Sequence, residues 1–461
     1  MKSRDPKDQL KFAVFMSGDS NYHLAGWRLP DSYADSGMKL ERWIEFARTM
    51  ERGKLDMLFI ADSIGTHGAD DLESMRHNPQ TDRLEPFTLL SALSSVTKHI
   101  GLAATCHTTY NEPFHVARKF ASLDHLSGGR AGWNFVTGAN AEDALNFSRE
   151  SHTAHGDRYD RAEEFADVVL GLWDSFDDDA FLRDKESGAY LDTSKFHVLN
   201  HKGKYFQVKG PLSMPRPPQG HPVLIQAGKS EPAKEISARV ADAVFTSQST
   251  MEEAQAFYAD VKGRMAKFGR APDSLKILPG VVIFTGPTPE EAEEKYRRLD
   301  SLISEKAAMR LLSERMGGID LSPYDFDGPL PDFEGNKVRM SNPPALVKLA
   351  RREGLTLRGL AMRFAAARGH LMLRGTPVQI ADRLEEWFKN RACDGFIFMP
   401  VYLPGALDDF VDQVIPELQR RGLFRREYEG RTLREHLGLQ RPASIFTDRA
   451  AARAESSASS L

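Results

Sequence analysis

Polar residues stand at the ends of three short apolar runs early in the chain. Asp62 follows the run 57–61, Thr105 ends the run 100–105, and Asn134 lies within the run 132–137. A carboxylate, a hydroxyl and an amide can hydrogen-bond the ring nitrogens and carbonyls of a ligand. Each residue also has a structural explanation: Asp caps helices, Thr favours strands, and an amide facing a helix needs only a local partner. The two explanations stay open for all three residues.

A second group of polar residues lies where two helices are expected to begin. His155 and Tyr159 are four residues apart and share one face of a helix. Ser230 follows the apolar run 222–227 and Gly228, and it precedes another helical segment. Helix N-termini favour anions, because their free N–H groups and the helix dipole are both positive. These residues therefore suit a phosphate, although two ordinary capped helix starts would show the same pattern.

The elements that must position these residues alternate regularly. Apolar, β-forming runs are followed by amphipathic helical segments, and eight such units can be counted, with strands at 10–16, 57–61, 100–105, 132–137, 222–227, 243–246, 277–284 and 395–399. Parallel strands need a helical crossover between neighbours, so we predict an α/β fold, a (β/α)8 TIM barrel with loop insertions. A doubly wound open sheet uses the same units, but no GxGxxG follows the first strand.

The spacing of the units predicts one barrel domain over 10–425. Insertions near 139–160, 174–220 and 287–376 interrupt it, and the last contains helical pieces at 290–315 and 345–367. Loops that follow barrel strands line the active face, so these insertions are expected to shape a binding site. A C-terminal extension, 426–461, ends in a small, polar tail that we expect to be disordered.

Composition narrows the classes of function. The chain has 461 residues, a formal net charge of −4 and two cysteines, Cys106 and Cys393. No basic stripe is present, so binding to nucleic acid or to an acidic membrane is not expected. The cysteine count excludes a disulfide scaffold, and no signal peptide or long apolar segment is visible, so we expect a cytoplasmic protein. HExxH, CxxC, GxSxG and Walker motifs are absent from the sequence, and no metal is expected.

Several separated blocks carry a family resemblance. FIADS, TTYNEPFHVARKFASLDHLSGGRAGWNFVTG, HGDRYDRAEEF and PVLIQAGKS occur in this order, followed by ADAVF. In this combination the chain resembles the bacterial luciferase-like flavin monooxygenases. More closely, it resembles the branch of nitrilotriacetate monooxygenase component A, with the sulfone and long-chain alkane monooxygenases. The resemblance extends over roughly residues 10–425.

The resemblance implies where a flavin would bind. FMN is expected at the carboxyl ends of the barrel strands, with Asp62 and Thr105 near the isoalloxazine and Asn134 as a further contact. His155, Tyr159 and Ser230 are then expected towards the ribityl phosphate. The sequence departs from the family around Ser230, because Lys229 replaces a small residue and Glu231-Pro232 follows. Pro232 removes one backbone donor, whereas Lys229 could add a charge to the phosphate.

The resemblance also implies a reaction. Reduced FMN, delivered by a separate NAD(P)H:FMN reductase, would react with O2 to a C4a-hydroperoxyflavin that oxygenates a small organic substrate. His107 and His23 are candidate proton carriers for this reaction. Trp27, Trp133 and Phe135 are candidates for the apolar walls of a dry pocket, with core packing as the alternative. A homodimer or homotetramer is expected for such an enzyme.

Other functions stay open at this point. A deazaflavin-dependent oxidoreductase would use the same barrel for hydride transfer without oxygen. A non-catalytic flavin-binding protein would bind FMN and form no product, and a barrel hydrolase with paired carboxylates would have no flavin affinity. The sequence does not identify the organic substrate.

Overall fold

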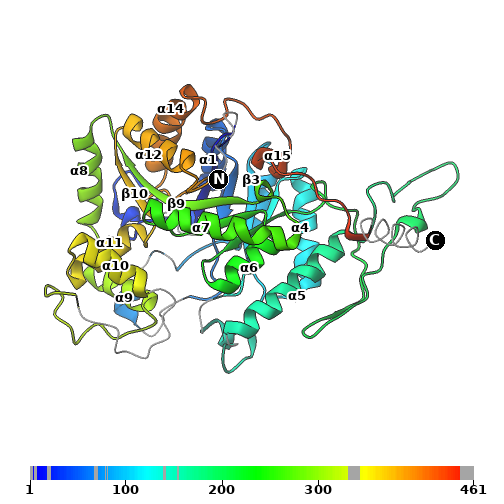
Figure 1. Cartoon of the computed structure of the whole chain (residues 1–461), viewed down its shortest axis with the longest axis horizontal. Coiled ribbons are helices and arrows are strands. Elements are labelled where there is room, and N and C mark those ends of the chain that lie inside the picture. Colours follow the sequence, from blue (N-terminus) through cyan, green and yellow to red (C-terminus); the bar gives the residue numbers. More distant parts are fainter. Residues whose placement is uncertain are drawn as a thin grey trace.

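The computed structural model of the chain is shown in Figure 1. The structure describes residues 4, 8–17, 22–66, 71–77, 79, 81–138, 142–152, 155–330 and 343–446. The tail expected to be disordered, 449–461, lies outside these residues, since the description ends at residue 446. Among the described residues, none of the helices combines the length and the apolar character needed to cross a bilayer.

Eight parallel strands close into a barrel. They follow one another around it as β1 (Lys11–Met16), β2 (Met57–Ile60), β3 (Gly101–His107), β4 (Ala131–Val136), β7 (Val223–Ala227), β8 (Ala243–Thr246), β9 (Lys276–Thr285) and β11 (Gly395–Phe398). The pairing of β8 with β9 and of β11 with both β9 and β1 completes the ring. The predicted TIM barrel is confirmed. Strands β5 (His201–Lys202) and β6 (Gln207–Val208) form a separate hairpin.

Alternation along each strand separates an inner from an outer core. On β2, Met57 and Phe59 belong to the cluster inside the barrel, whereas Leu58 and Ile60 pack outward against the helices. Trp133 and Phe135 on β4 also point outward, and Trp133 contacts Phe120 and Phe165 of the helical layer. Of the two explanations for these β4 aromatics, core packing is therefore the right one.

Helices surround the barrel, as Figure 1 shows. The helices between successive strands are α1 (Leu40–Arg52), α2 (Leu72–Met75), α3 (Pro86–Ser94), α4 (Pro113–Ser127), α5 (His155–Trp173), α6 (Glu231–Val240), α7 (Met251–Arg264) and α12 (Pro377–Lys389). After β11 the chain forms α13 (Gly405–Asp409), a π-helical turn (Phe410–Val414) and α14 (Ile415–Arg420). Helices α3, α4 and α12 carry Pro at the start, where its missing N–H is no loss.

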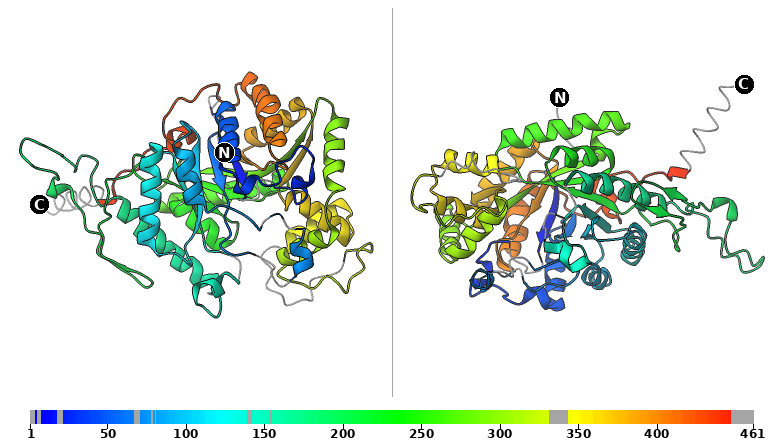
Figure 2. Two further views of the ribbon diagram at one scale, coloured as in Figure 1. Left: turned by 180° about the vertical axis from the view of Figure 1, so that it is seen from behind. Right: turned by 90° about the horizontal axis from the view of Figure 1, so that it is seen from below.

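The third insertion forms a helical lobe beside the barrel. It contains α8 (Pro289–Asp300), α9 (Glu305–Arg315), α10 (Pro343–Glu353) and α11 (Leu357–Ala367), so each predicted helical piece is two helices. Helices α9, α10 and α11 share an apolar core with Leu24 and Ala25, which follow β1. Both views in Figure 2 show this lobe at one side of the barrel. The lobe therefore stands next to the carboxyl ends of the strands.

A ninth strand, β10 (Leu371–Gly375), was not predicted. It follows the helical lobe and pairs in parallel with Val281–Thr285, the second half of the long strand β9. The first half of β9 pairs with the short strand β8 instead. Because β9 is longer than its barrel neighbours β8 and β11, its second half has an edge that they leave unpaired, and β10 pairs with this edge.

The C-terminal extension closes the other end of the barrel. Helix α15 (Leu433–Leu437) places Leu433 in the inner core, so close to Gly101 that a β-carbon there would lie 2.5 Å from its Cδ1. Arg434 forms a buried ion pair with Asp242, at 2.7 Å, at the amino end of β8. Inward side chains of the barrel strands and α15 thus fill the base, and the opposite end is left for a binding site.

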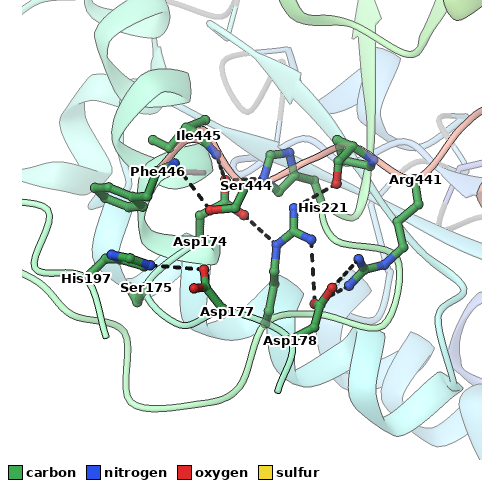
Figure 3. Close-up of polar contacts among 12 residues, drawn as sticks. Asp174, Ser175, Asp177, Asp178, His197, His221, Arg441, Ser444, Ile445 and Phe446 are labelled. Atoms are coloured by element: carbon green, nitrogen blue, oxygen red, sulfur yellow. Dashed lines mark hydrogen bonds and ion pairs between the residues drawn. The ribbon is translucent and has the colours of Figure 1, made fainter. Parts of the chain in front are cut away.

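Further contacts fix the chain after α15 to the second insertion (Figure 3). The buried carboxylate of Asp174 accepts hydrogen bonds from Arg216 Nε at 2.7 Å, from His221 Nε2 at 3.0 Å and from the Ile445 N–H at 2.9 Å. Arg441 adds a pair of contacts to Asp178. This network stands at the carboxyl end of α5, away from the open end of the barrel.

Candidate active site

The residues at the open end come from neighbouring strands in register. Thr105 on β3 is paired with Asn134 on β4, and the Asn134 Nδ2 donates a hydrogen bond to Thr105 Oγ1 at 2.8 Å. Both side chains are buried, and Asn134 faces the inside, opposite to its aromatic neighbours on β4. The amide oxygen, Asn134 Oδ1, is buried and accepts no hydrogen bond from any of the residues that the structure describes. An unpaired buried acceptor is costly, so this atom is suited to the N–H of a ligand.

Asp62 lies just beyond the end of β2, one strand away from Thr105. Burial raises the pKa of its carboxyl to about 6, against the charge of Arg83 and the N–H of Ser63, which lower it. The negative charges of Glu85 and Asp143 raise it further. Among the described residues, 61–66 contain no helix start, so Asp62 does not serve as the helix cap that the sequence left open. A carboxyl in this state can accept or donate a proton near neutral pH.

Two helix N-termini meet at the neighbouring part of the rim. Ser230 is the N-cap of α6, and its Oγ accepts the Ala233 N–H and donates to Tyr159 OH, both at 3.4 Å. Tyr159 stands in the first turns of α5, and His155 is the first residue of that helix, with its side chain outside the described part. Two of the three residues expected at a phosphate are therefore in contact. The meeting of two helix N-termini favours an anion.

The loop between β7 and α6 leaves room for a close approach. A β-carbon at Gly228 would lie 2.9 Å from the Ala233 Cβ, so no side chain fits there. Pro232 occupies the first turn of α6, where it removes one N–H from the anion site. The Nζ of Lys229 lies 3.5 Å from the Ser247 carbonyl oxygen beyond β8, to which it donates a hydrogen bond. The contribution of Lys229 to a phosphate stays a prediction.

The two candidate histidines differ in their surroundings. His107 is buried on β3, two residues beyond Thr105 and on the same inner face. His23 is fully buried, and its Nδ1 accepts the Ala25 N–H at 3.2 Å, so the ring proton sits on Nε2, which has no hydrogen-bond partner in the described ranges. Burial, with the charge of Arg368, lowers the pKa of His23 to about 3. At neutral pH His23 is thus a neutral hydrogen-bond donor rather than a charged acid.

Two features of the site were not predicted from the sequence. They are an aromatic cluster at the bottom of the barrel mouth and a cation, Arg158. Phe15, Phe59 and Phe245 form a mutual aromatic cluster across β1, β2 and β8, with ring centroids 5.7–5.8 Å apart. Their inward position follows from period-two alternation, which could have identified them. Arg158 precedes Tyr159 on α5, and its buried Nε has no hydrogen-bond partner within the described part of the chain. Its place beside Tyr159 within the block HGDRYDRAEEF was the available signal.

These features define a class of site at the open end of the barrel. It has an aromatic floor formed by Phe15, Phe59 and Phe245, a buried amide oxygen at Asn134, and an anion cradle formed by Ser230 and Tyr159 at two helix N-termini.

Comparison with known proteins identifies the family. The profile of the luciferase-like monooxygenases matches residues 20–394. Nitrilotriacetate monooxygenase component A of Aminobacter aminovorans is 52% identical, over 93% of this chain and 96% of its own. N-acetyl-S-(2-succino)cysteine monooxygenase of Bacillus subtilis (strain 168) is 50% identical, over 95% and 99%.

A solved structure agrees with this result. Riboflavin lyase with modified FMN and riboflavin superposes with a TM-score of 0.85 at 33% identity, covering 94% of this chain and 97% of its own. The chain belongs to the luciferase-like monooxygenase family. It is an enzyme, a monooxygenase, so a hydrolase or a non-catalytic flavin carrier no longer applies.

Proposed function

We propose that the chain is the oxygenase component of a two-component monooxygenase that uses reduced FMN and O2 to oxygenate a small organic substrate. The name of one relative, component A, supports a separate second component, for which we infer an NAD(P)H:FMN reductase. The similar riboflavin lyase, solved with modified FMN, supports the flavin. The observation that carries the proposal is the buried, unpartnered amide oxygen of Asn134 beside Thr105.

The described residues fit an isoalloxazine. Its ring carries both N–H donors and carbonyl acceptors, and the Asn134 oxygen would accept from a ring N–H while Thr105 holds the amide in place. Asp62, with its raised pKa, would exchange a proton or a hydrogen bond with the ring edge. Reduced FMN, when bound, supplies the electrons that activate O2, so that one oxygen atom enters the substrate and the other leaves as water.

The anion cradle would hold the terminal phosphate. The hydroxyls of Ser230 and Tyr159 would donate to it, the free N–H groups at the start of α5 and α6 would add their partial charge, and His155 would stand at the same helix start. Arg158 would add a full positive charge through its guanidinium, whose buried Nε has no hydrogen-bond partner among the described residues. Gly228 would let the backbone approach the ligand closely.

The apolar floor would keep water out. Phe15, Phe59 and Phe245 would give the mouth a low polarity and exclude the water that lets activated oxygen be lost as H2O2. His107 would hand a proton to the departing oxygen, and His23 would donate a hydrogen bond from its neutral ring.

Flavin titration and product analysis test this function. We expect the purified chain to bind reduced FMN, and to form an oxygenated product from a substrate panel only when a flavin reductase and NADH are added. Rapid NADH oxidation with FMN and no reductase would contradict the two-component scheme. Binding of the deazaflavin cofactor F420 in preference to FMN would favour the alternative cofactor instead.

A further inference from the structure

A cavity of about 170 Å³ lies outside the barrel mouth, between α8, the carboxyl end of β9 and the short helix α13 that follows β11. The chain after β1 forms a further wall. Figure 1 shows α8 beside β10, at the edge of the molecule. The apolar lining of the cavity consists of Leu29, Ile283, Phe284, Leu299, Val401 and Ala406. Because a cavity of about 150 Å³ with such a lining holds a benzene molecule, this one has room for a side chain as large as that of leucine.

The cavity is separate from the flavin site that we propose. Among the described residues, those of β2, β3, β4, α5 and α6, which form that site, contribute nothing to its lining. Phe284 and Val401 belong to a buried apolar cluster, against which Phe15 and Phe245 of the aromatic floor also pack. Packed side chains thus lie between the cavity and the floor, so one ligand can occupy the mouth while another occupies the cavity.

The charged groups inside the cavity already have partners. Lys295 Nζ forms an ion pair with Asp409 Oδ2 at 2.6 Å and donates a hydrogen bond to the Thr285 carbonyl oxygen at 2.9 Å. The other carboxylate oxygen of Asp409 accepts a hydrogen bond from Gln413 Nε2 at 2.8 Å. These groups neutralise and satisfy one another, so they do not require a charged ligand.

Two further charges, of opposite sign, also line the cavity. Asp31 comes from the chain after β1 and Arg298 from α8, and both side chains are exposed. Neither forms an ion pair with any residue that the structure describes, whereas the adjacent Arg297 pairs with Glu293 at 3.1 Å. The carboxylate and the guanidinium therefore stand at one cavity, farther apart than a direct ion pair allows.

The phenol of Tyr402 adds a hydrogen-bond donor near both charges. Its ring packs against Gly405, where a β-carbon would lie 2.6 Å from Tyr402 Cε2, so the missing side chain leaves room for it. Burial raises the pKa of Tyr402 to about 12, the charges of Asp409 and Asp31 raise it as well, and the charge of Arg298 lowers it. The phenol therefore keeps its proton at neutral pH and can donate it in a hydrogen bond to a ligand.

We propose that this cavity binds a small zwitterion with an apolar side chain, an α-amino acid of the size of leucine. The ligand carboxylate would pair with Arg298 and accept from the Tyr402 hydroxyl, the ammonium would pair with Asp31, and the side chain would enter the apolar lining. A ligand with a single charge would satisfy one of the two charged groups and be repelled by the other. The site uses neither the flavin nor the organic substrate of the mouth, so it goes beyond the proposed function.

Calorimetric titration of the purified, flavin-free chain with leucine and three analogues tests the proposal. Glycine lacks the side chain of leucine, 4-methylpentanoate lacks its ammonium, and 3-methylbutylamine lacks its carboxylate. We expect leucine to bind roughly thirtyfold more tightly than glycine, because most of its side chain leaves water. It should bind about fivefold more tightly than either singly charged analogue, which is the contribution of one exposed ion pair. Saturation with FMN should change the affinity for leucine less than about twofold.

Substitutions at the cavity test the roles of its residues. Arg298→Gln and Asp31→Asn should each weaken leucine about fivefold, and both residues are exposed, so neither change disturbs the core. The matched controls are Arg297→Gln and Asp35→Asn, which remove the same charges from exposed residues outside the cavity and should leave the affinity unchanged. Ala406→Leu, which fills part of the cavity, should weaken leucine about tenfold.

Several results would overturn the proposal. They are equal binding of leucine and 4-methylpentanoate, equal effects of R298Q and R297Q, and no binding of leucine by the unmodified chain. Displacement of leucine by FMN would place the amino acid in the barrel mouth and would also contradict a separate site. Because every titration can be made without flavin, failure of the chain to bind FMN would refute the proposed function and leave this site unaffected.

Discussion

Replacing Asp62 with Asn should stabilise the fold while it harms the active site. Burial raises the pKa of this carboxyl from 3.8 to about 6, so the folded chain holds the charged form less favourably than the unfolded chain does. Above pH 6 both states are ionised, and the native state bears the whole desolvation cost. Asparagine has nearly the same shape and can still accept the Ser63 N–H, but it carries no charge.

The size of the effect follows from that difference. A pKa raised from 3.8 to about 6 corresponds to about 3 kcal/mol between the two states. Because Asp62 is only partly buried, we expect D62N to gain about 2 kcal/mol at pH 7.5. The gain should shrink as the pH falls through 6 towards 4, because the unfolded carboxyl ionises first as the pH rises.

Urea unfolding of the protein without added flavin, at pH 7.5 and at pH 4.5, measures this directly. Asp174→Asn is the matched variant of opposite sign. Burial alone would raise the pKa of Asp174, but the hydrogen bond and charge of His221, with Arg216 and the Ile445 N–H, hold it below its ordinary value. D174N leaves those partners buried and without the charge, so it should cost about 3 kcal/mol at pH 7.5.

Comparison of D62N with D174N distinguishes the removal of a desolvated charge from a general effect of introducing Asn. Equal shifts of the unfolding free energy in D62N and D174N would refute the reasoning. A gain in D62N that is the same at both pH values would also refute it, because a desolvated charge must titrate. Reduced product formation by D62N, despite its greater stability, would fit a carboxyl retained for function.

The remaining predictions concern the flavin site and the barrel base. Asn134→Leu should lower FMN affinity at least tenfold in a fluorescence titration, since the ring loses its buried acceptor. Ser230→Ala should weaken FMN about tenfold but leave riboflavin, which lacks the phosphate, unchanged. Gly228→Ala should weaken both, because its β-carbon would meet Ala233. Leu433→Ala should lower the free energy of unfolding by about 3 kcal/mol, measured in urea, through the cavity left at the barrel base.

Local patterns in the chain were enough to predict the barrel. Each strand is a short apolar run, and each crossover is an amphipathic helix, so their order and number can be read without knowing any contact. The bounds of β8, 243–246, were predicted residue for residue. Alternation along 132–137 also identifies which face of the strand carries Asn134, because side chains in a strand point to opposite sides in turn.

Contacts between distant residues could not be predicted in this way. No sequence pattern predicted strand β10. It forms because the long strand β9 extends beyond its neighbour β8 and leaves an edge with which β10 can pair. The hydrogen bond of Lys229 depends on the position of Ser247, and the neutral state of His23 depends on its burial and on the charge of the distant Arg368.

The surroundings of His370 are the clearest case. Lys229, Arg315 and Arg368 are far apart in the sequence and look like ordinary surface charges there. In the folded chain all three charges act on the buried ring of His370, where little water is present to screen them. Amino-acid patterns therefore specify the barrel and the polar ends of its strands, whereas the sum of charges at one point in space arises only once the chain has folded.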